Sequence, residues 1–572
     1  MKKILYIGLS ILLTLATSCS DFLEEDNKGG VNNDDFYSTA SGYTTLVTAS
    51  YSSLRDVYGA QDPILQLAGT DIYMEGKDNA GPLYRYNALF ANNDDITEFY
   101  TNCYTAMQTI NTGIYYNNSP SDLSNEKKTQ YLGELRFLRA FYHFILIEQF
   151  GGVVIDSVYT NSAITNIPRS TLADSYNFVI NEMKAALNEV SESTEAGRVN
   201  KDVVNHYLAK VYLTRAWDLD SQDDFNTAIS YANAVISSKG DISISYEDVW
   251  SPDNENNGEF IFSIQYDLKS VADVKEGGNT QSSLFGVYGG TGGLGVKRYK
   301  DAYVPAQYLH ASFQDNDSRY QYNFMWAQHE VYFDYYEDQE SKIATYYPVI
   351  RNASQEELTA ADTAACIEAI GGEANKADVF RIFPIWAANT DYAREKYNKV
   401  SWLGATDKRL PTVKKFDCPD NAENCTLSYS ASVRDIVLAR LAETYFLKAE
   451  AYIGLNKIDE AREIVQKVID RPDNKISDSG VDITNAMDGV SSQQDALEAY
   501  LLETAKEMLG EYNGRWPLLR RTNMLQYMVE KYNDDLDRNN ITFDEKYILR
   551  PIPEDAITAN DGLTKEDQNP GY

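Results

Sequence analysis

Two consecutive amphipathic patterns near the C-terminus constrain the fold more than any other feature of the chain. Residues 433–454 repeat an apolar side chain every three or four positions, which predicts a helix with one buried stripe: Val437, Leu441, Tyr445, Ala449 and Tyr452. A turn at residues 454–456 leads to a second amphipathic run, residues 458–469. Small residues on both runs allow a close approach, so the pattern predicts a packed helix pair: Ala449, Ala451 and Ala461.

An earlier part of the chain repeats this arrangement. Residues 202–217 and 225–236 form a second pair of amphipathic runs with aromatic and alanine residues at similar spacing. Helix pairs of this composition resemble tetratricopeptide units. Because one pair cannot bury its apolar face alone, we expect a mainly α fold, a solenoid-like scaffold of stacked pairs. Further helical patterns cover residues 35–58, 97–117, 126–150 and 171–190.

The pattern changes between residues 241 and 432. Gly, Asn, Asp, Pro and Tyr dominate there, and apolar segments are short, as in the strand-like run 260–264. Long irregular stretches within a compact protein are usually functional. We therefore expect residues 34–240 and 433–572 to form two helical parts, and residues 241–432 to form a loop-rich, partly β insertion that contributes to a ligand face.

The N-terminus has the composition of a secretory signal. Lys2 and Lys3 precede a short apolar run, residues 4–16, which is too short to cross a membrane. Residues 16–19, Ala-Thr-Ser-Cys, resemble a bacterial lipobox, in which the cysteine is acylated and becomes the mature N-terminus. We therefore expect residues 1–18 to be a lipoprotein signal peptide and Cys19 to carry the lipid. An anchor with more than one acyl chain holds a protein stably at a membrane.

The segment after the cysteine predicts a solvated tether. Residues 19–33 are polar, acidic and contain a Gly-Gly pair. Their acidic cluster resembles the surface-export signal of lipoproteins in Bacteroides-like bacteria, and the alternative is a linker without a signal. No later segment is long and apolar enough to cross a bilayer. The expected location is the outer membrane, with the lipid-anchored chain facing the cell exterior.

Charge and cysteine content exclude several partners and sites. The chain has 51 Lys and Arg residues against 85 Asp and Glu residues, a net charge of −34 with no basic stripe, so we expect no nucleic acid partner. Anionic lipid is disfavoured for the same reason. Cys418 and Cys425 bracket a short loop with no His nearby, so in an oxidising compartment we expect a local disulfide rather than a metal site.

Several motifs resemble those of the SusD/RagB family of lipoproteins. Residues 133–142, Gly-Glu-Leu-Arg-Phe-Leu-Arg-Ala-Phe-Tyr, and 149–153, Gln-Phe-Gly-Gly-Val, are similar to the family's central helix. Residues 440–451 are similar to a later helix. The tail is similar to the family's C-terminus, with Lys-Tyr-Ile-Leu-Arg-Pro-Ile-Pro at 546–553 and Gln-Asn-Pro-Gly-Tyr at 568–572.

The resemblance implies a fold and a role. It implies tetratricopeptide-like helices under an irregular face, and an extracellular protein that binds glycans, or peptides in some relatives. It also implies that the protein acts as the lid of a SusC-like TonB-dependent outer-membrane barrel, which imports the ligand. Cys19 and the residues after it match the family's start, whereas the block 503–521 departs from the family pattern. Three hypotheses remain open: a glycan-capturing lid, the same architecture capturing peptides or another nutrient, and a structural subunit of the importer that binds no ligand.

No motif predicts catalysis. The histidines at positions 143, 206, 310 and 329 include no pair with HExxH spacing. Residues 290–295 match GxGxxG, but a dinucleotide site requires this motif between a strand and a helix, and a basic segment follows here. Residues 124–127 match SxxK without its companion motifs, and close carboxylate pairs are unavoidable among 85 acids. We expect no enzyme activity, no catalytic residue, no metal and no cofactor.

Sugar recognition requires flat rings for the apolar faces of the sugar and planar polar groups for its hydroxyls. The resemblance implies that ligand sites lie on loops after the first helix and within the insertion. The first such loop, residues 70–93, alternates rings with Asp, Arg and Asn. Each ring taken alone has core packing as its alternative role. The predicted ligand contacts are Asp71, Tyr73, Tyr84, Arg85, Tyr86, Asn92, Tyr288 and Trp326.

Overall fold

The computed structural model covers most of the helical parts and some of the insertion. It describes residues 33–59, 63–75, 81–161, 165–267, 278–285, 302–314, 317–330, 341–348, 359–382, 413–417, 432–474, 483–533, 535–536 and 540–572. Four of the predicted site residues lie outside these ranges: Cys19, Tyr288, Cys418 and Cys425. The anchor, the disulfide and one ligand contact therefore stay predictions.

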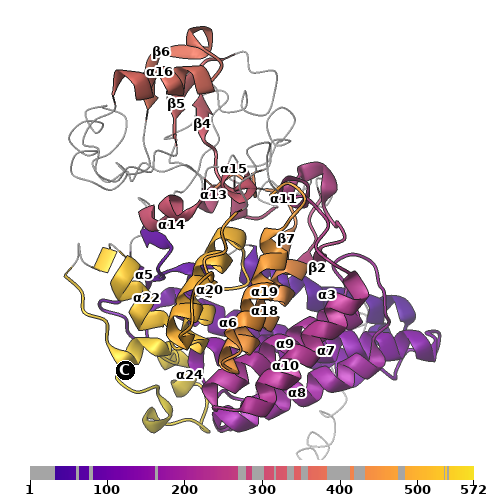
Figure 1. The fold of residues 1–572 in the computed structure, drawn as a ribbon. Helices are drawn as coiled ribbons and strands as arrows, with labels where there is room; N and C mark the ends of the chain where they lie inside the picture. The colour runs from indigo at the N-terminus through magenta and orange to yellow at the C-terminus, as the bar shows by residue number, and fades with distance from the viewer. Residues whose placement is uncertain are drawn as a thin grey trace, which may run out of the picture.

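The body of the molecule is a series of long helices, most of them packed against the next one in the chain (Figure 1). In the N-terminal part these are α2 (Asn33–Tyr37), α3 (Ala40–Tyr58), α4 (Ile64–Leu67), α5 (Pro82–Arg85), α6 (Asp94–Tyr116), α7 (Asn125–Phe150), α8 (Leu172–Glu189), α9 (Lys201–Asp218) and α10 (Gln222–Lys239). α10 packs in turn on α18 (Leu441–Gly454), which pairs with α19 (Ile458–Ile469). This architecture confirms the predicted mainly α fold built from helix pairs.

The beginnings of these helices follow from their capping residues. A side-chain oxygen before the first turn accepts a backbone N–H that has no partner within the helix. Ser124 accepts the N–H of Lys127 at 3.2 Å, so the SxxK match noted in the sequence is the N-cap of α7. The same arrangement opens α6, α8, α9 and α10, at Asn93, Thr171, Asn200 and Ser221.

Small residues let α18 approach its neighbours. The three alanines that the sequence pattern singled out on α18 and α19 are fully buried: Ala449, Ala451 and Ala461. At the end of α18, Gly454 lies against the ring of Phe225 on α10. A Cβ at this glycine would lie 2.3 Å from Cε1 of Phe225, so the approach of the two helices requires a residue without a side chain.

The first part of the 433–454 pattern is a strand rather than a helix. β7 (Ile436–Arg440) pairs antiparallel with β2 (Phe260–Ile264), the strand predicted from the sequence, and places Ile264 opposite Ile436. Every residue of β7 is buried, so Val437 packs in a strand and not on the helical stripe. A short segment that is buried on all sides carries no periodicity that separates a strand from a helix.

The insertion contributes two groups of short elements. One group lies on the helical body: α11 (Tyr246–Trp250), η1 (Pro252–Asn254), α13 (Gln281–Leu284), β3 (Tyr303–Pro305), α14 (Gln307–Ser312) and α15 (Ser318–Asn323). In the other group β5 (Ile343–Tyr346) lies between β4 (Ala327–His329), which is antiparallel to it, and β6 (Lys376–Ile382), which is parallel. With α16 (Ala360–Ala369) and η3 (Glu373–Asn375), this sheet forms the upper unit in Figure 1. These elements confirm a loop-rich, partly β insertion.

A buried cluster of charges fastens the insertion to the helices. The Arg440 guanidinium at the end of β7 donates to Glu259 at 2.7 Å, Glu507 at 2.9 Å and Glu511 at 2.8 Å. Arg471 donates to Glu259 and Glu507 at 2.7 and 2.6 Å. All five side chains are almost fully buried. Each buried charge therefore has opposite charges and hydrogen bonds around it, which such a cluster requires to persist in a low-dielectric interior.

The same cluster includes further residues of the insertion. Arg319 on α15 donates to Asp317 at 2.7 Å and to Glu503 at 3.1 Å, and Lys415 donates to Glu511 at 2.7 Å. Glu503 lies on α20 (Gln493–Glu507). The block 503–521 supplies carboxylates that hold the insertion in place: Glu503, Glu507 and Glu511.

The C-terminal tail closes against the end of α7. The backbone N–H of Arg550 donates to Gln149 O at 2.8 Å, and the side chain of Asn569 donates to Phe150 O at 3.0 Å. Gly151 ends α7 with a φ of 77°, which favours glycine. The motif at residues 149–153 therefore contacts the tail motifs at residues 546–553 and 568–572. The elements of this part are α20, α21 (Arg515–Arg521), α22 (Leu525–Tyr532), η6 (Glu545–Ile548), α24 (Glu554–Thr558) and η7 (Lys565–Asp567).

Candidate ligand-binding site

Asp71, the first predicted ligand contact, is buried. Its carboxylate accepts hydrogen bonds from Arg515 Nε at 2.8 Å and Nη2 at 2.5 Å, and from the Tyr308 hydroxyl at 2.6 Å. The Asp71 side chain has no exposed surface. Burial alone would lower the pKa of Arg515, but the charge of Asp71 outweighs it and raises that pKa. The prediction for Asp71 is corrected, because this residue joins α14 to α21 beneath the surface.

Three predicted rings of the same loop are buried too. Tyr73, Tyr84 and Tyr86 are at most 1% exposed. The hydroxyl of Tyr73 accepts the backbone N–H of Gly510 at 2.5 Å. The hydroxyls of Tyr84 and Tyr86 donate to backbone carbonyls. A ring that is closed in by the core and bonded through its hydroxyl presents no face to a ligand, so the prediction for these three rings is corrected as well. Tyrosine suits the core edge as well as a ligand surface, which is why the sequence alone did not separate the two roles.

Arg85, the one basic side chain predicted as a ligand contact in this loop, lies partly at the surface. It donates to the Glu75 carboxylate through Nε at 2.6 Å and Nη2 at 2.5 Å, and the Arg85 side chain is 35% exposed. Glu75 ends β1 (Tyr73–Glu75), which pairs antiparallel with β3 so that Glu75 lies opposite Tyr303. The backbone N–H of Glu75 donates to Asp535 at 2.5 Å. The pair with Glu75 raises the pKa of Arg85, and the guanidinium has a fixed orientation at the surface.

Two half-buried tyrosines stack on elements joined to this pair: Tyr308 lies three residues after β3, and Tyr532 lies three residues before Asp535, which accepts the N–H of Glu75. The rings of Tyr308 on α14 and Tyr532 on α22 have centroids 4.1 Å apart and planes inclined by 20°. Tyr308 donates to Asp71, which is itself held by Arg515. The stack is therefore built on a buried ion pair, and its orientation does not depend on a flexible side chain.

The second ring of the stack is oriented by a carboxylate. Glu498 on α20 accepts hydrogen bonds from Tyr532, from Tyr527 at 2.7 Å and from Lys531 at 2.5 Å. Burial alone would raise the pKa of Glu498, but these donors lower it. We name this surface the β1–α22 face. It comprises Glu75, Arg85, Tyr308, Tyr527, Lys531 and Tyr532.

The β1–α22 face combines rings with fixed donors and acceptors. Such a surface can bind a polyol through ring stacking and through hydrogen bonds to its hydroxyls. The sequence predicted only Arg85 among its residues. Tyr308 and Tyr532 are 224 residues apart in the sequence. Each lies in a short amphipathic pattern that gives no sign of the other. Only the tertiary fold brings them together.

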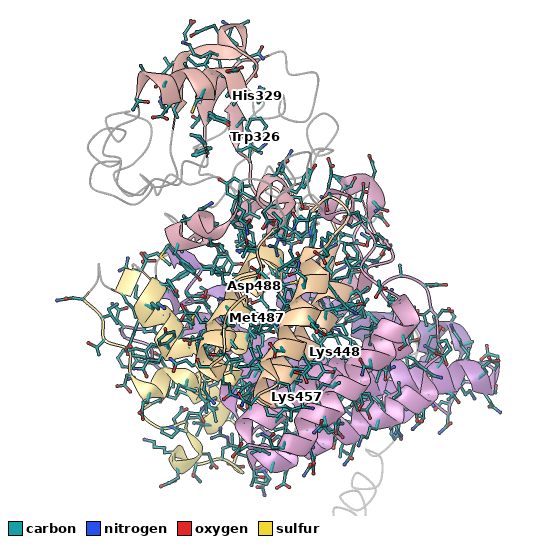
Figure 2. The ribbon with its side chains drawn as sticks, in the orientation of Figure 1. Trp326, His329, Lys448, Lys457, Met487 and Asp488 are labelled. Carbon is teal, nitrogen blue, oxygen red and sulfur yellow. The ribbon has the colours of Figure 1, made fainter. Side chains whose placement is uncertain are left out.

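Asn92 and Trp326 are the other predicted ligand contacts that the structure describes. Asn92 is exposed, one residue before the N-cap of α6. Trp326 is half-buried in the upper sheet unit, where its ring meets that of Tyr346 at 5.7 Å and 90°. Figure 2 shows Trp326 in that unit, away from the helices. A ligand site shared by the loop of residues 70–93 and Trp326 stays a prediction.

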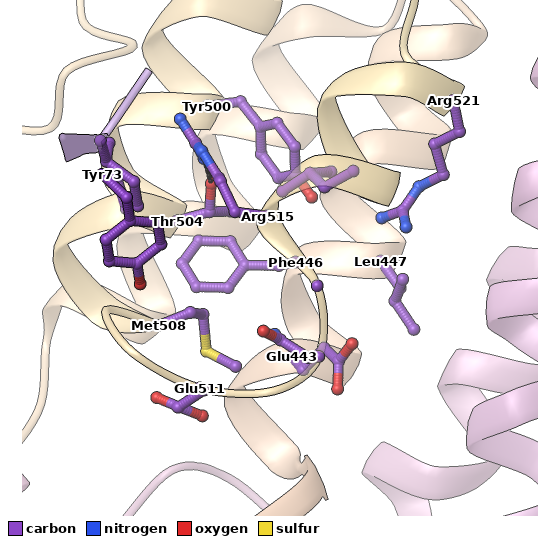
Figure 3. Close-up of a pocket in the computed structure, with 15 residues that line it drawn as sticks. Tyr73, Glu443, Phe446, Leu447, Tyr500, Thr504, Met508, Glu511, Arg515 and Arg521 are labelled. Carbon is purple, nitrogen blue, oxygen red and sulfur yellow. Dashed lines mark hydrogen bonds between the residues drawn. The ribbon is translucent and has the colours of Figure 1, made fainter. Parts of the chain in front are cut away.

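The cavity between α18, α20 and α21 is too small for a sugar. It has a volume of about 30 Å³, which corresponds to one or two water molecules. Figure 3 shows its lining, which includes Phe446, Met508 and Arg515. This is a packing gap beneath the β1–α22 face.

A larger groove lies on the helical body. It has a volume of about 360 Å³ and polar walls from the start of α7 and from residues 191–198. At its base Glu134 accepts hydrogen bonds from Gln130 and Tyr51 at 2.8 Å and from Arg198. These groups satisfy one another and join α3, α7 and the loop after α8.

The described residues contain no group of three or more His, Cys, Asp or Glu side chains that could hold a metal ion. His143 accepts the N–H of Asp156 at 3.2 Å and is fully buried, and burial lowers its pKa to about 4. His310 is buried against Phe324, and burial lowers its pKa to about 3. Both rings are therefore neutral packing groups. Within the described part of the chain, no helix has the length and apolar character that a membrane span requires.

A scaffold of stacked helix pairs places the protein in the tetratricopeptide-like class of folds. Comparison with known proteins identifies the family within this class of folds. The sequence model of the SusD family matches residues 253–572, and one described as "starch-binding associating with outer membrane" matches residues 47–213. The first match covers more than half of the chain. The protein belongs to the SusD/RagB family.

Individual relatives agree with this assignment. A SusD-like protein of Formosa agariphila is 23% identical over 92% of this chain and 94% of its own length. One from Bacteroides ovatus is 25% identical over 46% of this chain, and the match spans half of that relative. A solved SusD homolog of Bacteroides thetaiotaomicron has a TM-score of 0.71 at 17% identity, covering 94% of this chain and 98% of its own. A laminarin-binding SusD-like protein has a TM-score of 0.64 at 15% identity, covering 93% and 100%. These structures share the fold.

Proposed function

We propose that the protein is a cell-surface lipoprotein that captures a glycan and delivers it to a TonB-dependent outer-membrane transporter, without catalysing a reaction. One observation carries the proposal: the Tyr308–Tyr532 stack, at 4.1 Å, is linked to the Arg85–Glu75 pair through Asp535, which lies three residues after Tyr532 and accepts the N–H of Glu75. Rings that are oriented before binding lose little side-chain entropy when a ligand stacks on them.

Family membership supports the choice of ligand. The sequence model that matches residues 47–213 is described as starch-binding and associated with the outer membrane, and one solved relative is described as laminarin-binding. The β1–α22 face fits a neutral glycan because its two cations are already paired with carboxylates: Arg85 with Glu75 and Lys531 with Glu498. In this proposal the acylated Cys19 anchors the protein, and the barrel is its partner.

Isothermal titration of the full-length protein in detergent, against laminarin, starch and a peptide mixture, tests the proposal. We expect binding to a glycan and a loss of about tenfold in affinity for Tyr532→Ala, equivalent to about 1.4 kcal/mol. Tyr231→Ala is the matched control, because Tyr231 is also half-buried and stacks on a tyrosine, Tyr212, but on the helical body. Unchanged binding by Tyr532→Ala, or breakdown of the glycan by the pure protein, contradicts the proposal.

A further inference from the structure

A second group of aromatic side chains lies at the surface near the start of the described chain. Phe36 and Tyr37 of α2, Tyr115 and Tyr116 at the end of α6, and Tyr159 after α7 contact one another in series. The ring centroids are 5.5 Å apart for Phe36–Tyr37, 5.1 Å for Tyr37–Tyr116, 4.9 Å for Tyr116–Tyr115 and 4.3 Å for Tyr115–Tyr159. We name these five residues the N-terminal ring cluster.

The cluster is more exposed than core packing requires. Tyr115 is 61% exposed, Phe36 is 40% exposed, and Val158, beside Tyr159, is 63% exposed. These are three of the seven large hydrophobic side chains that the described residues expose. Single exposed apolar residues are common on protein surfaces, but a contiguous group marks a binding surface.

The geometry fixes Tyr115 as a platform. Tyr159 stacks on one face of the ring, with an interplanar angle of 27°, and Tyr116 meets it edge-on at 88°. The exposed surface of Tyr115 therefore comes mainly from its opposite face and outer edge. Tyr116 is itself held by a hydrogen bond to the Asp34 carboxylate. A ring that is fixed in this way loses little entropy when a ligand stacks on it.

The charges around the cluster favour a neutral ligand. Asp34 and Asp35 are exposed in the first turn of α2, and the chain as a whole has a net charge of −34. Phosphate groups and anionic lipid headgroups are repelled by such a surface. A neutral sugar carries no charge and is not repelled. Its apolar face can stack on a ring, and its hydroxyls can donate to carboxylates.

We propose that the N-terminal ring cluster is a second glycan-binding site, made of elements other than those of the β1–α22 face, and that it takes a neutral sugar ring on Tyr115. The inference rests on the proposed function. Two sites on one chain bind a long polymer more tightly than a short oligosaccharide, since the second contact is intramolecular. The cluster therefore contributes to the retention of polysaccharide rather than to the affinity for a short ligand.

Native gel electrophoresis of the full-length protein, with laminarin or starch cast into the gel, tests the second site. We expect Tyr115→Ala to weaken the retardation by the polymer by at least about fivefold, and Tyr115→Phe to behave as wild type. Titration with a short oligosaccharide of the same linkage is expected to give the same affinity for Tyr115→Ala and wild type. Leu219→Ala is the matched control, because Leu219 is 42% exposed on the helical body and outside the cluster.

The outcomes separate the two sites. Normal retardation of Tyr115→Ala combined with impaired Tyr532→Ala overturns the second site and leaves the proposed function intact. The reverse result supports the cluster and overturns the β1–α22 face. If Tyr115→Ala retains glycan but no longer co-purifies with an outer-membrane barrel, the cluster is a protein interface and the inference is overturned. No retardation of the wild type by either polymer overturns both proposals.

Discussion

The guanidinium carbon of Arg550 lies 4.1 Å from the centre of the Trp516 ring. Both side chains are almost completely buried, and none of the three Arg550 guanidinium nitrogens has a hydrogen-bond partner among the described residues. Burial lowers the pKa of Arg550. The face of an aromatic ring is a favourable environment for a cation that has lost its water. The contact joins the C-terminal tail, residues 546–553, to α21, so these two parts of the chain are held together by a buried cation and a ring.

Replacing this ring is expected to destabilise the protein strongly. Trp516→Leu leaves a cavity in the core and a buried cation without its ring, so we expect the free energy of unfolding to fall by about 3 kcal/mol or more. Trp516→Phe keeps an aromatic face and is expected to cost less. Urea denaturation of the three proteins measures the difference. Equal destabilisation by Leu and Phe would show that the ring face contributes nothing beyond its volume.

The buried charge cluster predicts a loss of stability in acid. The pKa of Glu507 is lowered to about 2, because Arg471, Arg440 and Arg319 outweigh the effect of burial, which alone would raise it. A carboxylate with a lowered folded-state pKa stabilises the fold above its unfolded value of about 4.5, and this contribution is lost as the pH falls towards 2. Glu443, beside Lys210 and His206, behaves in the same way, with a pKa of about 2. We expect the free energy of unfolding to fall by about 3 kcal/mol per such group between pH 4.5 and pH 2.

The variant Glu507→Gln tests how much Glu507 contributes to this pH dependence of stability. At pH 7 the variant removes a buried carboxylate that Arg440 and Arg471 share and leaves the remaining carboxylates to balance both cations, so we expect it to be less stable than wild type by about 3 kcal/mol or more. Below pH 4.5 its stability is expected to vary less with pH than that of wild type. Denaturation curves at pH 7, 5, 4 and 3 measure both effects. Parallel pH profiles for the two proteins would rule out Glu507 as a main contributor.

The contact between Gly454 and Phe225 predicts that a second substitution restores the stability lost by a first one. Gly454→Ala places a Cβ 2.3 Å from the Phe225 ring, and we expect the resulting overpacking to cost about 1–3 kcal/mol. Phe225→Leu in the same chain makes room for the new methyl group. Thermal unfolding of the single and double variants is expected to show that the double variant is more stable than the sum of the two single effects. Simple additivity would contradict the proposed clash.

Much of the helical body could be predicted from the sequence, because its helices are long and amphipathic and most of them have a capping side chain directly before the first turn. The strand 260–264 was predicted for a related reason, since a short apolar run bounded by polar residues resembles a buried strand. β7 could not be recognised, because all five of its residues are buried and it runs directly into α18. Whether such a segment is strand or helix depends on its partner, β2.

The candidate site was less predictable for a physical reason. Tyr73, Tyr84 and Tyr86 alternate with polar residues as a ligand loop does, but their hydroxyls satisfy buried backbone groups instead. Tyr308 and Tyr532 carry no local signal, because their stack depends on where α14 and α22 dock. Arg85 was the exception, since an arginine in a polar loop is expected at the surface.

The Arg85–Glu75 pair is expected to matter for binding and not for stability. A pair at the surface contributes about 0–1 kcal/mol to folding, so Arg85→Ala is expected to unfold at nearly the wild-type denaturant concentration. Its affinity for the glycan is expected to fall by about tenfold, equivalent to about 1.4 kcal/mol, because a fixed donor of the β1–α22 face is lost. Arg215→Ala is the matched control, since Arg215 makes a similar two-pronged pair with Asp224 on the helical body. Equal affinities of the two variants would remove Arg85 from the site.

Attachment to the membrane is expected to depend on Cys19 alone. Among the described residues no helix can span a bilayer, and a net charge of −34 disfavours adsorption to an anionic surface. Cys19→Ala is therefore expected to move the protein from the membrane pellet to the soluble fraction, whereas Cys103→Ala, a buried cysteine of α6, leaves it in the pellet. Protease treatment of intact cells is expected to digest the wild-type protein if the chain faces the exterior. A Cys19→Ala protein that stays in the pellet after a high-salt wash would show that the anchor lies elsewhere, because salt removes proteins held only by surface charge.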